Sequence, residues 1–213
     1  GFSQDKATLE EERQVRQSII KAIRERLQGF GAPGPWSNFD YDFSNTLFFY
    51  STNFMFSHFD AFSYFHGVTF TQNADFSMAE FTKDADFSWA RFTGDADFSW
   101  ARFTKDADFS RAIFTQDAGF YGAAFIKSVI FSKATFQTDP IFVNIRRGKT
   151  YKARFSCKAD PEDYRFEVNP DSPCKIETEE KEYNGVKFRI PKGAILFDPD
   201  EPSDQEDNNS KDS

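Results

Sequence analysis

Cysteine is nearly missing from this chain of 213 residues, since Cys157 and Cys174 are its only two. Both lie outside the region that shows a repeat, so the fold depends on neither a disulfide framework nor a four-ligand zinc site. We interpret them as free thiols, with a single disulfide between them as the alternative.

Long apolar segments are missing as well. No run approaches the roughly 18 to 20 residues of a membrane span, and the first residues lack the layout of a secretory signal. The chain is therefore predicted to be soluble and cytoplasmic. Because it opens with Gly1 and not with methionine, a longer product whose upstream part carries a membrane anchor is the alternative, and it would place this region on the cytoplasmic side of a membrane.

Groups suited to catalysis are scarce. The two histidines, His58 and His66, fall on the expected solvent side of a repeat, and no motif places a base near a serine, cysteine or aspartate. The sequence has no phosphate-binding glycine loop, no spacing typical of metal ligands and no dinucleotide fingerprint. It therefore predicts a protein that is not an enzyme and that holds no cofactor and no metal.

Methionine and leucine are rare, whereas phenylalanine supplies 29 residues. One register of phenylalanines occupies positions 43, 48, 54, 59, 65, 70, 76, 81, 87, 92, 98, 103, 109, 114, 120, 125, 131, 136 and 142, spaced 5, 6, 5, 6 throughout. Two residues before each stands a mostly small side chain, which is alanine at ten consecutive sites from Ala74 to Ala123. Residues i and i+2 of a strand share a face, so this pair points inward while its polar neighbours point to water.

The repeat is clearest in Ala85-Asp86-Phe87-Ser88-Trp89 and Ala107-Asp108-Phe109-Ser110-Arg111. These segments resemble the pentapeptide-repeat family, whose consensus is a small residue, a polar residue, Leu or Phe, a small polar residue and a variable one. The resemblance covers residues 41–142 and implies an all-β fold, a right-handed quadrilateral β-helix. Every second repeat here has one added residue, which we place at alternate corners, so that two units of 11 residues close one coil of 22.

The N-terminal region, residues 1–36, is interpreted as a helix and a linker. The helix is predicted over residues 8–28 and opens with a capping box of Thr8 and Glu11. One apolar stripe recurs along it and consists of Val15, Ile19, Ile23 and Leu27, with Ile20 beside it. We interpret the stripe as a cap over the open end of the repeat stack, which would otherwise expose unpaired strand edges. A docking surface for another protein or an upstream domain is the alternative.

The repeat region is placed at residues 37–142, because Arg147 occupies the next site at which a phenylalanine is due. Short alternating runs broken by proline then predict a small C-terminal β segment over residues 143–199. The acidic, apolar-poor residues 200–213 are predicted to be disordered. A basic run consists of Arg146, Arg147, Lys149, Lys152, Arg154 and Lys158. We interpret it as a guard against end-to-end association, with anionic lipid or nucleic acid as the alternative partner.

The candidate partner-binding surface lies two residues after alternate phenylalanines. This position is occupied by Met78, Trp89, Trp100 and Arg111, whose side chains should point outward. Aromatic residues and arginine are the usual anchors of protein interfaces, so a protein partner is expected here. The alternative is that the tryptophans lie flat along the rod and cover the aliphatic stems of lysine and arginine.

A candidate acidic ladder recurs with the coil and stacks like charges above one another. It consists of Asp84, Asp86, Asp95, Asp97, Asp106 and Asp108. Two interpretations are open: the ladder binds cations or a basic partner, or it only solvates the rod.

Together these features predict a non-enzymatic structural or protein-interaction scaffold. Some members of the family resemble DNA in shape and charge and bind DNA gyrase in its place, so DNA mimicry is one alternative. The rod over residues 43–142 has eleven acidic and seven basic side chains, a net charge of −4, whereas a mimic should be strongly and continuously negative. A regulatory module attached to a membrane-anchored upstream region is the other alternative. Nucleic acid is not an expected partner, and a membrane is expected only through an upstream segment.

Overall fold

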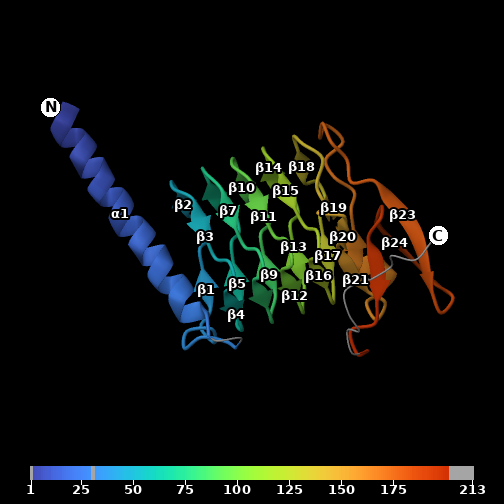
Figure 1. The fold of residues 1–213 in the computed structure, drawn as a ribbon. Helices are drawn as coiled ribbons and strands as arrows, with labels where there is room; N and C mark the ends of the chain where they lie inside the picture. Colours follow the sequence, from blue (N-terminus) through green and yellow to red (C-terminus); the bar gives the residue numbers. More distant parts are fainter. Residues whose placement is uncertain (1, 30–31, 202–213) are drawn as a thin grey trace.

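The computed structural model describes the backbone of residues 2–29 and 32–201, and the side chains from residue 8 onward. The chain runs from one helix, α1 (Phe2–Leu27), into a stack of short strands and ends in longer strands on the far side of that stack (Figure 1). The molecule is thus a β-solenoid with one terminal helix, as predicted. From residue 202 onward, the predicted acidic tail lies outside the described residues.

Four walls of parallel strands form the solenoid. Wall 1 consists of β1 (Tyr41–Asp42), β5 (Ser63–Tyr64), β9 (Ala85–Asp86), β13 (Ala107–Asp108), β17 (Val129–Ile130) and β22 (Tyr164–Arg165). Wall 2 consists of β2 (Leu47–Phe48), β6 (Thr69–Phe70), β10 (Arg91–Phe92), β14 (Ile113–Phe114) and β18 (Thr135–Phe136). Wall 3 consists of β3 (Thr52–Asn53), β7 (Ala74–Asp75), β11 (Ala96–Asp97) and β15 (Ala118–Gly119). Wall 4 consists of β4 (His58–Phe59), β8 (Glu80–Phe81), β12 (Arg102–Phe103), β16 (Ala124–Phe125), β21 (Arg154–Ser156) and β25 (Ile195–Phe197).

Strand pairing confirms the coil of 22 residues. In wall 3, Ala96 pairs with Ala74 on one side and with Ala118 on the other. The backbone hydrogen bonds run from coil to coil along the rod; the N–H of Phe76, for example, donates to the carbonyl of Asp97 at 2.8 Å. Each coil is therefore joined to the next one along all four walls.

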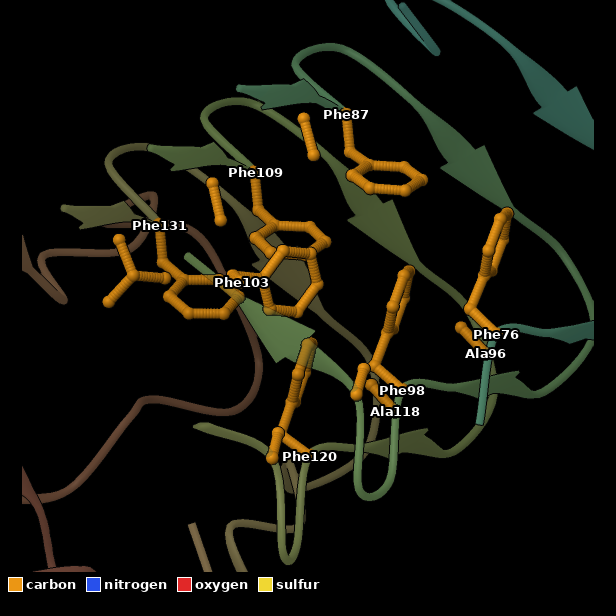
Figure 2. Close-up of a cluster of buried hydrophobic side chains, with 14 of the residues drawn as sticks. Phe76, Phe87, Ala96, Phe98, Phe103, Phe109, Ala118, Phe120 and Phe131 are labelled. Atoms are coloured by element: carbon orange, nitrogen blue, oxygen red, sulfur yellow. The ribbon is translucent and has the colours of Figure 1, made fainter. Parts of the chain in front are cut away.

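Stacked phenylalanine rings fill the interior (Figure 2). Phe76, Phe98 and Phe120 form one column with ring centroids 5.1 and 5.4 Å apart and planes within 2° of parallel. A neighbouring column meets it edge-on, as Phe87 does against Phe98 at 5.1 Å and 81°. From Phe54 to Phe136 every phenylalanine of the register is at most 1 % exposed. The inward register predicted from the 5 and 6 spacing is confirmed, and both ring geometries are ones that aromatic pairs favour.

Two kinds of corner alternate around each coil. A short corner, such as residues 76–79, is closed by the N–H of Ala79, which donates to the carbonyl of Phe76 at 3.1 Å. A long corner, such as residues 82–84, is a bend that holds the added residue of the 11-residue unit. The added residue therefore lies at alternate corners, as predicted.

Helix α1 differs from the prediction in where it begins and in how much of its apolar stripe is buried. It begins at Phe2, so Thr8 lies inside the helix and does not form its N-terminal cap. Leu27 is fully buried and Ile23 packs against the first coil, whereas Val15 is 60 % and Ile19 54 % exposed. The helix leaves the stack toward its N-terminus (Figure 1), so the cap interpretation holds only near its C-terminal end, for Ile20, Ile23 and Leu27.

The solenoid continues beyond Phe142, where the sequence predicted its end. A hairpin of β19 (Val143–Arg146) and β20 (Lys149–Lys152) stands in place of a short corner. The N–H of Ala153 donates to the carbonyl of Phe142 at 2.7 Å, which is the bond that closes every short corner. Phe155 then stacks on Phe125 with centroids 5.2 Å apart. The hairpin moves the register by eight residues, from 147 to 155, and this is why Arg147 stands where phenylalanine was due.

The last coil is closed by a second hairpin. The 3-10 helix η1 (Pro161–Asp163) lengthens the next corner, after which Phe166 stacks on Phe131 at 6.1 Å. The hairpin of β23 (Thr178–Tyr183) and β24 (Val186–Pro191) then buries Phe188 and Ile190, which are 1 % and 0 % exposed. The C-terminal β segment therefore contains both the last strands of the walls and the cover of this end.

Candidate partner-binding site

The four candidate residues all lie at the third position of a short corner, in a left-handed backbone. Met78, Trp89, Trp100 and Arg111 have φ angles of 56°, 59°, 61° and 58°. Other coils have glycine at this position, namely Gly67 at 61° and Gly122 at 74°. Glycine adopts this conformation freely, whereas an L side chain costs about 1 to 2 kcal/mol there. The large side chains therefore stand where the backbone favours the smallest residue.

The structure divides these residues between two edges of the rod. Each coil has two short corners, one between walls 1 and 2 and one between walls 3 and 4, so residues 22 apart share an edge and residues 11 apart do not. Edge A carries Asn45, Gly67, Trp89, Arg111 and Lys133. Edge B carries Phe56, Met78, Trp100 and Gly122. The single stripe expected from the sequence is thus two separate edges, because a half-turn of the coil lies between consecutive members.

On edge A, a cation–π contact joins Trp89 to Arg111 one coil further on. The guanidinium carbon of Arg111 lies 4.5 Å from the centroid of the indole, within the distance at which such contacts are favourable. Trp89 is nevertheless 54 % exposed. The arginine restrains the indole while a large part of the ring stays accessible, so a partner that binds it loses less side-chain entropy than it would with a free tryptophan.

On edge B, Trp100 packs within its own chain. Its ring meets Tyr151 of β20 edge-on, with centroids 5.2 Å apart. It also lies against Gly122, where a Cβ would come within 2.6 Å of the indole atom Cδ2. These contacts join the solenoid to the inserted hairpin.

The aspartates of the acidic ladder hold backbone groups. In walls 1 and 3, the carboxylates of Asp86, Asp97 and Asp108 accept a hydrogen bond from the backbone N–H two residues on, at 2.8, 2.8 and 2.7 Å. This Asx arrangement supports the turn that follows. In the long corners, Asp84 accepts from the N–H of Asp106 in the next coil at 3.3 Å. Much of the ladder therefore has a structural role in shaping the corners.

Metal binding finds no support in the described part of the chain, which contains no group of three His, Cys, Asp or Glu residues placed to hold an ion. Both cysteines are free thiols there. Burial is the main cause that raises the pKa of Cys157, and it raises the pKa of Cys174 as well. A raised pKa lowers the fraction of reactive thiolate at neutral pH.

The structure brings together a serine and a histidine that no sequence motif linked. His66 Nδ1 lies 2.8 Å from Ser88 Oγ, and Ser88 Oγ lies 2.5 Å from Asp86 Oδ1. The hydroxyl donates to the carboxylate, so the imidazole is not placed to remove its proton, as a catalytic histidine would. The signal in the sequence was the 22-residue separation of positions 66 and 88. The cluster joins two neighbouring short corners of edge A.

The basic run lies partly in the inserted hairpin and partly in wall 4. The guanidinium of Arg146 lies 5.0 Å from the ring centroid of Tyr121, and that of Arg154 lies 4.4 Å from the ring of Phe197. Lys158 Nζ is 3.0 Å from a carboxylate oxygen of Asp198. Arg146 and Arg154 therefore make cation–π contacts within the chain, and Lys158 forms an ion pair.

The walls, the phenylalanine core and the variable corners define a repeat protein of the β-solenoid class. A family model for pentapeptide repeats, described as having 9 copies, matches residues 65–113. The repeats of this chain are pentapeptide repeats, as the resemblance of the Ala-Asp-Phe segments implied. No curated protein and no solved structure matches the chain. The described part of the chain contains no helix with the length and apolar character that crossing a bilayer requires.

Proposed function

We propose that the protein is a rigid, non-catalytic scaffold that binds a protein partner at edge A, through Trp89 and Arg111. The observation that carries this proposal is an exposed indole restrained by an arginine, at a backbone position that favours glycine. Folding gains little from a tryptophan placed in this way, whereas tryptophan and arginine are the residues most enriched at the centres of protein interfaces. Binding explains both the residue and its position.

The neighbours of Trp89 suggest the character of the partner surface. Along edge A, Arg111 lies one coil after Trp89, and Lys133 lies one coil after Arg111. A complementary surface would offer an apolar pocket for the indole and carboxylates beside that pocket for the two cations. Because the rod has a dry phenylalanine core, edge A is presented without the cost of ordering a flexible loop.

Glycine substitution separates binding from folding at these corners. Trp89→Gly removes the indole and keeps a residue suited to the left-handed backbone, and Met78→Gly does the same on edge B, where Met78 is 46 % exposed. The intact chain and both variants are used to capture partners from a lysate of the source cells, and the affinity of each for the purified partner is then measured. We expect Trp89→Gly to weaken binding at least about tenfold, as for a central interface residue, and Met78→Gly to leave it unchanged. Equal binding by all three proteins would contradict the assignment of edge A.

A further inference from the structure

Exposed apolar side chains are concentrated at the N-terminal end of the molecule. Among the side chains that the structure describes, 15 large hydrophobic residues are exposed, of which ten lie within residues 9–64 and three within residues 65–142. The ten are Leu9, Val15, Ile19, Trp36, Phe39, Leu47, Phe49, Phe56, Phe62 and Tyr64. A concentration of this kind marks an interaction surface more often than scattered single residues do.

Helix α1 contributes an exposed face to this end. Val15, Ile19 and Ala22 lie on it with Ser18 between them, and Glu11 and Gln14 flank them. Val15 is 60 % and Ile19 54 % exposed, so the body of the protein leaves much of this face uncovered. The helix runs away from the stack toward its N-terminus (Figure 1). Small side chains at its centre permit a second helix to approach closely.

Charge is distributed unevenly along α1. Residues 8–12 contain three glutamates and no base, whereas residues 13–27 contain five bases and one glutamate. Within the helix, Glu10 pairs with Arg13 at 3.8 Å and Glu12 with Arg16 at 2.8 Å. The first part of the helix is therefore acidic and the second part basic, which makes the helix complementary to a reversed copy of itself.

Two charged residues of the exposed face lack an oppositely charged partner among the described residues. Glu11 and Arg26 lie near the two ends of that face, on the same side of the helix as Val15 and Ala22. The guanidinium of Arg26 lies 5.7 Å from the ring of Trp36, itself 39 % exposed. Fifteen residues separate the two charges, about 22 Å along a helix.

We propose that α1 pairs antiparallel with α1 of a second copy of this chain, in a two-fold symmetric dimer. The two-fold axis passes between Ser18 and Ile19, so that Glu11 of each copy meets Arg26 of the other and Val15 meets Ala22. This contact is the same on both copies, as two-fold symmetry requires. Reversing the partner also places its solenoid beside the N-terminal half of α1, toward which the helix leaves the body. A parallel pair would instead bring Glu11 beside Glu11.

The test is sedimentation equilibrium of the chain between about 1 and 100 µM, a range suited to a single helix pair that buries less than roughly 1,000 Å². The chain has a mass of 24.6 kDa, and we expect it to approach twice this value as its concentration rises. Glu11→Arg and Arg26→Glu should each weaken association about tenfold, because each change replaces two attractive pairs by two repulsive ones.

Mixing the two variants gives the sharpest result. A pair made of one Glu11→Arg chain and one Arg26→Glu chain has opposite charges at both contacts, so the equimolar mixture should associate as tightly as the unsubstituted chain. Lys21→Glu, which lies off the exposed face and breaks only the Lys21 and Glu25 pair at 3.8 Å, is the matched control and should leave the dimer intact. Thermal unfolding of each variant confirms that it is folded.

Three outcomes would overturn the proposal. They are a monomer throughout the range, single variants that associate as tightly as the parent, and a mixture that fails to recover. The result is also independent of the proposed function, because Trp89→Gly changes edge A alone and should dimerise like the parent chain.

Discussion

A left-handed backbone at the third residue of each short corner reverses the usual effect of glycine. Within a helix or strand, glycine in place of alanine destabilises the folded protein by roughly 0.5 to 1 kcal/mol. At φ near 60° the effect is reversed, because the Cβ of alanine causes strain there. We therefore expect Trp89→Gly to be more stable than Trp89→Ala, and to lie within about 1 kcal/mol of the parent chain. Urea unfolding of the three proteins checks this order. An alanine variant more stable than the glycine variant would mean that the corner is not left-handed in solution.

Gly122 is the opposite case, because glycine is required there for two reasons. Its φ is 74°, and an added Cβ would come within 2.6 Å of the Trp100 ring. We expect Gly122→Ala to lower the free energy of unfolding by about 2 kcal/mol or more. Combining it with Trp100→Gly should recover part of this loss, because the clash disappears. A double-mutant cycle in urea measures the coupling, and strictly additive losses would contradict the contact.

The stability of the last coil should depend on the ionisation of Tyr164 at alkaline pH. Its hydroxyl donates to the carbonyl of Ser156 at 2.8 Å, and burial raises the pKa of Tyr164 well above its usual value near 10. The unfolded chain therefore loses this proton first, so the contribution to stability is full below pH 10 and falls as the pH rises above 10. At pH 8 we expect Tyr164→Phe to be about 1 kcal/mol less stable than the parent. The difference should shrink by pH 11 in denaturant titrations, and an unchanged difference would contradict the pKa shift.

At this scale the sequence predicted which residues point inward and which point outward. The alternation of alanine and phenylalanine is sufficient for that, because a coil with one large side chain per wall has a single way to fill its centre. The contacts of Trp89 with Arg111 and of Trp100 with Tyr151 were not predicted. They join residues whose neighbourhood depends on which positions share an edge and on where the hairpin inserts.

Among the elements, the hairpin β19–β20 is an insertion and not the end of the repeat. We expect the chain to fold when residues 143–152 are replaced by a Tyr-Gly pair, the residues that form the equivalent corner at Tyr121 and Gly122. The replacement restores the distance of 22 residues between equivalent positions and keeps the bond from Ala153 to Phe142. Circular dichroism and thermal unfolding check that the walls remain, and tryptophan emission should move to longer wavelength because Trp100 loses Tyr151. Loss of cooperative unfolding would show that the hairpin is needed for the last coil.

The sequence analysis missed the insertion because it required a phenylalanine at a fixed spacing. An inserted hairpin breaks that spacing in the same way as the end of the repeat does. The signal was nevertheless present, since Ala153-Arg154-Phe155 repeats the triplet of a small residue, a polar residue and phenylalanine. The helix start at Phe2 was missed for a related reason. Thr8 and Glu11 match a capping box, but the apolar and charged residues on both sides of them are equally compatible with a helix that continues.

For the molecule as a whole, each phenylalanine depends mainly on its own coil and the two beside it. We expect Phe98→Ala, in the middle of the rod, to cost about 3 to 5 kcal/mol because it leaves a cavity between two stacked rings. Phe43→Ala should cost clearly less, because Phe43 is only partly buried and stacks on one ring in its column, Phe65, at 5.2 Å. Urea unfolding measures both. Equal losses would mean that the first coil is covered as fully as the middle ones, for example by a partner at the N-terminal end.

The 22-residue coil determines how the rod should unfold when its two ends are pulled apart. All walls are held together by hydrogen bonds that run along the rod axis, so a pull on the two ends loads these bonds one coil at a time and does not shear many strands together. Each coil that comes away would release 22 residues, or about 75 Å of extended chain. In a single-molecule stretching experiment, the rod should therefore lengthen in a series of small, nearly equal steps at low force, one step for each coil.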